Sequence, residues 1–128
     1  MSNLTIKSLS KADIETALNL VWKVFLEFEA PDYTQEGIDE FYRSIHDEDY
    51  LAALSLYGAF MNEELVGIIA TRSGGKHIAL FFVDGKYHRQ GIGKQLFQSV
   101  KTDKMTVKSS PYAVPVYSKF GFKPVNTE

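Results

Sequence analysis

The sequence predicts an α/β protein in which helices flank a mixed central sheet. Segments with apolar residues at helical spacing alternate with short apolar segments of strand length. One unbroken apolar run, Ile78–Val83, is typical of a strand buried on both faces. A basic, Gly-rich turn and an amphipathic segment follow that run directly. These observations predict the element order β-α-α-β-β-β-α-β-α, with room for one short C-terminal strand after Phe122.

The composition is that of a globular protein and excludes several kinds of function. The 128 residues fit one domain, 1–128, with a hydrophobic content of 45% and a charged content of 23%. A formal net charge of −2 gives no reason to expect nucleic acid or an anionic membrane as a partner. The absence of cysteine excludes disulfides, thiolate metal ligands and a cysteine nucleophile. The N-terminus lacks an apolar leader and no apolar run is long enough to span a bilayer, so we expect a cytoplasmic protein.

The N-terminal part predicts a strand followed by two helices. Residues 4–9 have the apolar pattern of a short strand, and Ser10 to Asp13 have the Ser-x-x-acid form of a helix start. The first helix is expected to end at Ala30-Pro31-Asp32, because proline interrupts helical hydrogen bonding. A second helix is expected from near Thr34 to Ile45. The acidic run 47–49 is interpreted as a solvated loop.

The remaining chain predicts a hairpin, the central strand and two more strand–helix steps. Segments 56–61 and 65–71 flank a turn-like spacer, which is typical of a hairpin. After the central strand we expect a helix near 92–100, a short strand at 105–109 and a short helix at 111–120 that ends at Gly121.

The turn after the central strand has the features of an anion-binding cradle. The first N–H groups of a helix have no intrahelical partner, and the helix dipole leaves that end partly positive. Gly91 and Gly93 carry no Cβ, so a ligand could approach the backbone closely. Neither common nucleotide motif fits, because Gln95 follows Gly93-Lys94 where a Walker A loop needs Ser or Thr. Leu96 stands where a dinucleotide fingerprint needs its third glycine.

Two motifs resemble those of the GNAT (GCN5-related N-acetyltransferase) superfamily. The turn is similar to its Q/R-x-x-G-x-G/A signature, and Tyr117 to Phe122 resemble its Y-x-K-x-G-F ending. The resemblance implies that acetyl-CoA binds through its pyrophosphate to the turn. His88 stands where the superfamily has Gln or Arg, so backbone N–H groups would make much of the contact with the pyrophosphate. The predicted cradle residues are His88, Arg89, Gln90, Gly91, Ile92, Gly93 and Lys94.

The end of the central strand is the second predicted contact with acetyl-CoA. In the superfamily this strand end pairs with the pantetheine arm, which corresponds here to Phe81, Phe82 and Val83. A backbone N–H group there would also face the thioester oxygen and stabilise the oxyanion of acyl transfer. The alternative is that Phe81, Phe82 and Val83 only pack in the core of the sheet. The two interpretations are compatible, because the side chains can be buried while the backbone groups contact acetyl-CoA.

Tyr117 is the predicted general acid, because the resemblance places its phenol where the CoA thiolate leaves. The alternative is that Tyr117 only packs near Phe120 and Phe122. Glu29 is the predicted general base for the acceptor amine, as an acid that helical spacing places beside Leu18 on an apolar face. Other candidates for the base are Glu27, Asp32, His77 and Asp84, or a chain of water molecules. The three histidines lack metal-ligand spacing, so no metal is expected.

The resemblance therefore predicts an acetyl-CoA-dependent N-acetyltransferase that acts by direct attack of a primary amine. The acceptor would be a small amine or a lysine, and the acidic residues around the first helix suit a cationic one. Dimers are common in the superfamily, so the resemblance allows a homodimer. The alternative function is a non-catalytic module on the same fold that senses acyl-CoA or binds a partner.

Overall fold

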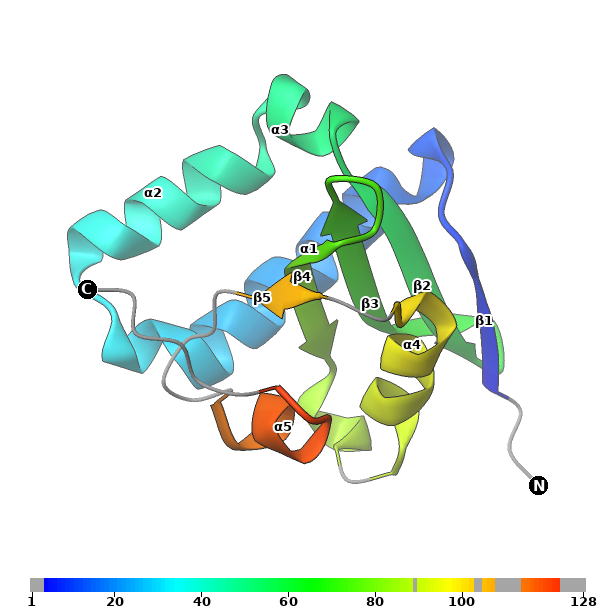
Figure 1. The fold of residues 1–128 in the computed structure, drawn as a ribbon. Coiled ribbons are helices and arrows are strands. Elements are labelled where there is room, and N and C mark those ends of the chain that lie inside the picture. The colour runs from blue at the N-terminus through cyan, green and yellow to red at the C-terminus, as the bar shows by residue number, and fades with distance from the viewer. Residues whose placement is uncertain (1–3, 89, 103–104, 108–113, 123–128) are drawn as a thin grey trace.

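A five-stranded mixed sheet forms the centre of the protein (Figure 1). The computed structural model describes residues 4–88, 90–102, 105–107 and 114–122. The strands lie in the order β1-β2-β3-β4-β5; the first four are antiparallel, and β5 runs parallel to β4. Their bounds are β1 Leu4–Ser8, β2 Ser55–Met61, β3 Glu64–Arg72, β4 His77–Val83 and β5 Thr106–Val107.

Helices cover both faces of this sheet. The α-helices are α1 Ile14–Val24, α2 Gln35–Ile45, α3 Glu48–Ala52, α4 Ile92–Val100 and α5 Val114–Lys119. Short 3-10 turns η1, η3 and η4 lie at Lys11–Asp13, Ala30–Asp32 and Gly85–Tyr87, and a π-helical turn, η2, lies at Phe25–Glu29. Within the described ranges, every helix is too short or too polar to cross a lipid bilayer.

Two apolar clusters hold the layers together, one on each face of the sheet. Successive side chains of a strand point to opposite faces, so β4 contributes to both clusters. Leu80 and Phe82 pack with α1 and α2. The ring centroids of Phe82 and of Phe41, on α2, are 6.1 Å apart. Phe81 and Val83 pack on the other face, beside α4 and Tyr117 of α5. The strand is thus buried on both faces, as its apolar run predicts.

The predicted mixed sheet with flanking helices is confirmed, and one local prediction is wrong. The run 47–49 is not a loop, because the Asp47 side chain accepts the Tyr50 N–H at 3.1 Å and begins α3. The first helical segment ends at Ala30–Asp32 as predicted, where Tyr33 is extended, but its last turns are the π turn η2 and the 3-10 turn η3. The predicted C-terminal strand falls within 123–128 and therefore lies outside the described residues.

The described residues pair strand β4 with β5 at two positions. The pairs His77↔Thr106 and Ile78↔Val107 are the only ones that join these strands within the described residues. The pairing of β4 with β3 skips Ala79, which is the extra residue of a β-bulge. A bulge bends its strand. From Leu80 onward β4 therefore remains paired with β3, whereas its other edge has no described partner strand.

An ion pair ties the end of β4 to α1. Lys23 Nζ lies 2.9 Å from Asp84 Oδ2, and Asp84 is 4% exposed. The other carboxylate oxygen of Asp84 accepts the Lys86 N–H at 3.0 Å and so caps η4. One buried carboxylate thus fixes both the helix that crosses β4 and the start of the turn that leads to α4.

Replacement of Asp84 by asparagine should lower stability in a pH-dependent way. Burial opposes ionisation, but the Lys86 N–H and the Lys23 ammonium outweigh it, and the pKa of Asp84 lies below its ordinary value. Because the pKa is lower in the folded state, the ionised carboxylate stabilises the fold at pH values above its unfolded-state pKa of about 3.9. This contribution is lost as the pH falls through the folded-state pKa. We expect Asp84→Asn to lower the free energy of unfolding by about 1–2 kcal/mol at neutral pH.

Urea unfolding at neutral pH and at about pH 3 would measure this difference. The deficit of the variant should shrink in acid, where the wild-type carboxylate is also protonated. Asp32→Asn, at an exposed position, is the matched control and should change stability by less than about 0.5 kcal/mol. An equal deficit at both pH values would show that charge is not the cause.

Candidate active site

The N-terminus of α4 forms an open cradle next to the end of β4. Gly91 precedes the helix with φ 83°, a left-handed conformation that favours glycine. A Cβ added at Gly91 would meet no atom of the described residues within 4 Å, so among these residues the space beside its backbone is open. A Cβ at Gly93 would lie 3.6 Å from the Phe81 ring, which is ordinary contact. Gly91 is therefore the glycine that the turn requires, whereas Gly93 lies against the end of β4.

The direction of the backbone groups of β4 follows from one hydrogen bond. The Asp84 N–H donates to the Val66 carbonyl of β3 at 2.8 Å. Because direction alternates along a strand, the N–H and C=O groups of Phe82 also point toward β3. Those of Phe81 and Val83 point the other way, toward the edge at which β5 pairs with His77 and Ile78. Of the three predicted strand residues, only these two can present backbone groups at that edge.

His88 lies in the predicted cradle, but its side chain turns back to the strand. Its Nε2 is 2.8 Å from the Val83 carbonyl oxygen, and a carbonyl can only accept, so Nε2 carries the hydrogen. The ring also packs against Phe28 of η2, with 4.8 Å between the ring centroids. The imidazole thus ties the turn to the end of β4. His88 is one of the predicted cradle residues, and in this structure its Nε2 donates to the protein.

The other predicted cradle residues divide into buried and exposed side chains. Phe82 and Ile92 are buried in the two apolar clusters and can offer a ligand only backbone groups. Gln90 and Lys94 are exposed, and Gln90 Nε2 lies 3.4 Å from the Lys86 carbonyl. Arg89 lies outside the described residues.

Tyr117 reaches the same edge from α5. Its ring centroid is 5.9 Å from that of Phe81 and 5.5 Å from that of Phe122, and the side chain is buried. Phe81 therefore lies between the start of α4, at Gly93, and Tyr117. Three segments that are distant in sequence meet around one residue of β4.

Glu29 lies close enough to Tyr117 to act on it electrostatically. Burial raises the pKa of the Tyr117 phenol, and the negative charge of Glu29 raises it further. Burial and the same carboxylate also raise the pKa of Tyr33. Glu29 ends the π turn η2 and is partly buried. The fold therefore brings together the two residues predicted as acid and base.

Sequence reasoning missed Phe28, which packs directly against the turn. A Cβ at Gly85 would lie 2.8 Å from the Phe28 ring, so only glycine allows this approach. Phe28 also contacts the His88 ring, as described above. The π turn widens the helix and changes which residues share a face, and an analysis at 100° per residue cannot include that change. Among the described residues, no group of three acidic, histidine or cysteine side chains could hold a metal ion.

Comparison with known proteins gives one family match. A family model described as an acetyltransferase (GNAT) domain matches residues 29–128. This range includes β4, the cradle and α5. No curated protein gives a significant sequence match.

Several solved structures share the fold. A GCN5-related N-acetyltransferase from Rhodopseudomonas palustris has a TM-score of 0.80 at 20% identity, and the match covers 94% of this chain and 82% of that one. The PaiA N-acetyltransferase from Thermoplasma acidophilum, in complex with coenzyme A, has a TM-score of 0.79 at 22% identity, with 100% and 94% covered. An aminoglycoside N-acetyltransferase in complex with CoA has a TM-score of 0.67 at 15% identity, with 100% and 93% covered. At these identities the likeness concerns the fold.

Proposed function

The chain belongs to the GNAT acetyltransferase family, and on this premise we propose that it moves an acetyl group from acetyl-CoA to a primary amine. The observation that carries the proposal is the meeting of four features at one edge of β4. These are the strand edge that has no partner strand among the described residues from Leu80 onward, the cradle at Gly91, the phenol of Tyr117 and the carboxylate of Glu29.

The residues present fit acetyl-CoA. The N–H groups at the start of α4 suit the pyrophosphate, and Gly91 leaves space for it. The backbone groups of Phe81 and Val83 point toward the open edge, where an extended amide-containing arm could pair with them. The Val83 carbonyl already accepts a hydrogen bond from His88, so the Phe81 groups and the Val83 N–H are the proposed partners. Exposed Lys94 would add positive charge.

Bound acetyl-CoA supplies a thioester that an amine can attack directly, and no cysteine is present to form an acyl-enzyme. In the proposed reaction Glu29 takes a proton from the acceptor ammonium, because only the neutral amine is a nucleophile. A backbone N–H at Phe81 or Val83 donates to the carbonyl oxygen of the thioester as negative charge develops there. As the C–S bond breaks, Tyr117 donates its proton to the departing sulfur. The new amide nitrogen releases its extra proton to solvent, and the phenolate regains a proton from solvent. The raised pKa of Tyr117 keeps the phenol protonated at neutral pH, as a donor requires.

The acceptor is proposed to be cationic. Glu27, Glu29 and Asp32 lie on consecutive turns at the end of α1, and Tyr33 follows them. Carboxylates attract an ammonium group, and an aromatic face can add a cation–π contact. A polyamine, an amino sugar or a lysine side chain would meet this requirement.

Two measurements test the proposal in sequence. Acetyl-CoA at about 100 times its Kd should stabilise the protein by about 2.7 kcal/mol, which a thermal melt detects. Thiol release from acetyl-CoA over a panel of polyamines, amino sugars and lysine peptides then tests turnover. Absence of a melting shift at millimolar acetyl-CoA would contradict the proposed ligand. Binding without acetylation of any amine would favour the alternative function, a sensor of acyl-CoA.

Replacement of Gly91 by valine should weaken acetyl-CoA binding by tenfold or more, because the side chain would enter the open space of the cradle. Isothermal titration calorimetry would measure the Kd. Gly74→Val is the matched control, since Gly74 also has positive φ (69°) and no atom near an added Cβ, but lies in the turn between β3 and β4. Both variants carry backbone strain of about 1–2 kcal/mol. Equal effects of the two on the Kd would contradict a role for the cradle.

Tyr117→Phe should lower kcat by about 10²–10⁴-fold, the range typical of general acid catalysis. The KM for acetyl-CoA should change little, because the ring and its contacts with Phe81 and Phe122 are kept. Steady-state kinetics with the best amine of the panel would measure both. Tyr57→Phe, in the same apolar cluster but on β2, is the control and should keep full activity. Full activity of the Tyr117 variant would exclude the phenol as the acid.

Glu29→Gln should lower kcat/KM at neutral pH, where the acceptor is mostly an ammonium ion. The deficit should shrink as the pH approaches the pKa of the amine, about 10.4 for a lysine-like group, because neutral amine then forms without a base. A pH–rate profile measures this. Glu15→Gln, at an exposed position in the first turn of α1 and outside this acidic group, is the control and should follow the wild-type profile. A deficit that is constant with pH would assign Glu29 a structural role only.

A further inference from the structure

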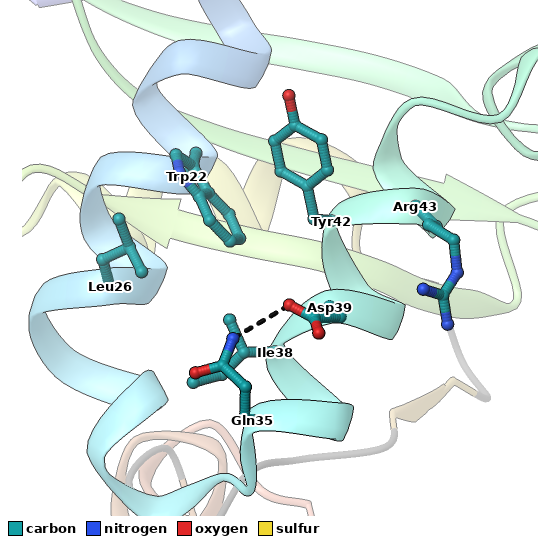
Figure 2. A pocket seen from close by; sticks show the side chains of 7 residues that line it. All are labelled: Trp22, Leu26, Gln35, Ile38, Asp39, Tyr42 and Arg43. Carbon is teal, nitrogen blue, oxygen red and sulfur yellow. Dashed lines mark hydrogen bonds between the residues drawn. The ribbon is translucent and has the colours of Figure 1, made fainter.

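The π turn η2 carries Glu29, the proposed base, and one side of this turn faces a hollow. Phe25 anchors the start of the turn in the core. Leu26 is 45% exposed and lines a groove of about 460 Å³ between this segment and α2 (Figure 2). Glu27 is exposed as well. π turns are rare, and helical segments depend mostly on the packing of their apolar face. The position of Glu29 therefore depends on contacts that η2 makes elsewhere.

Phe28 packs on the turn that leads from β4 to the cradle. A Cβ built on Gly85 would lie 2.8 Å and 2.9 Å from two atoms of the Phe28 ring, so the ring rests directly on the Gly85 backbone. The centroid of the same ring is 4.8 Å from that of His88. Both partners are held by other contacts, since Gly85 follows the buried Asp84 and His88 donates to the Val83 carbonyl at 2.8 Å. Phe28 thus joins η2 to backbone that the protein already fixes.

Glu29 directly follows Phe28 and ends the same π turn. We propose that Phe28 is a positioning residue for acetyl transfer, because its packing on Gly85 and His88 holds Glu29 where the carboxylate can take the proton of the acceptor amine. A reacting group must be held close to its productive geometry, and a displacement of about 1 Å can lower the rate about 10²-fold. In this role Phe28 acts through Glu29 and needs no contact with either substrate. The inference rests on the proposed function.

The glycine at position 85 gives access to this contact from its other side. Gly85 is not among the residues with positive φ, so its backbone conformation does not require glycine. An added Cβ would clash only with the Phe28 ring, because the next atom, Glu27 Oε1, lies at 3.6 Å, which is ordinary contact. Gly85 therefore leaves space for the ring, and the contact can be perturbed from either residue.

Replacement of Phe28 by leucine tests the proposal through the pH dependence of the reaction. Leucine is apolar but lacks the ring that packs on Gly85 and His88. We expect Phe28→Leu to lower kcat/KM for the acceptor about 10- to 100-fold at neutral pH. The deficit should shrink as the pH approaches the pKa of the amine, about 10.4 for a lysine-like group, as it should for Glu29→Gln. The Kd for acetyl-CoA, measured by isothermal titration calorimetry, should change little.

Two double variants distinguish positioning from a general loss of structure. Phe28→Leu should lower the rate no further in a Glu29→Gln background, because the group that it positions is already gone. Gly85→Ala alone should reproduce the kinetic defect, because the added methyl displaces the Phe28 ring. In the Phe28→Leu background Gly85→Ala should have little further effect, since the ring with which it clashes is absent.

Phe60→Leu is the matched control, because Phe60 is also partly buried but lies on β2, which does not adjoin β4. It should keep the wild-type pH profile, and thermal melts verify that every variant folds. An active wild type whose Phe28 variant keeps that profile, or loses the same factor in rate at every pH, would overturn this inference alone. A further loss of rate in the Glu29→Gln background would do the same. A wild type that acetylates no amine would contradict the proposed function and this inference with it.

Discussion

The geometry of strand β4 is the constraint on which the rest of the site depends. Backbone N–H and C=O groups that leave water must find partners. Strand β4 pairs along one edge with β3, and within the described residues its other edge pairs with β5 only at His77 and Ile78. The bulge at Ala79 bends the strand just after these two pairs. From Leu80 onward the described residues place no strand at that edge, and a ligand with amide groups of its own, as the proposed function requires, could pair there.

The contacts around that edge hold the turn to α4 in one geometry. Asp84 forms an ion pair with Lys23 of α1 and accepts the Lys86 N–H of η4. His88 donates to the Val83 carbonyl. Phe28 fills the space beside Gly85 that any other residue would occupy. Because these groups come from α1, η2 and the turn itself, contacts within the protein hold the described part of the turn. A site that is already ordered loses less entropy on binding.

Much of the fold and part of the site could be predicted from the sequence, because those features are local. The apolar run Ile78–Val83 and the helical spacing after Gly91 each depend on residues close together in the chain. The π turn could not be predicted, and neither could the contacts of Phe28 and His88, since these arise from packing between distant segments. The side chain of His88 illustrates the limit. Its position in the motif was evident, but only the fold shows that it donates to the strand.

The proximity of Glu29 to Tyr117 links the two proton transfers of the proposed reaction. While Glu29 is ionised, its charge opposes loss of the phenol proton and helps to raise the pKa of Tyr117. Once Glu29 has accepted a proton from the amine, that charge is gone and only burial still raises the pKa. The phenol thus becomes a better donor after the amine has been activated, when the leaving sulfur needs a proton. In the proposed reaction, protonation of Glu29 thus removes the smaller of the two influences that raise the pKa of Tyr117, and burial keeps the larger.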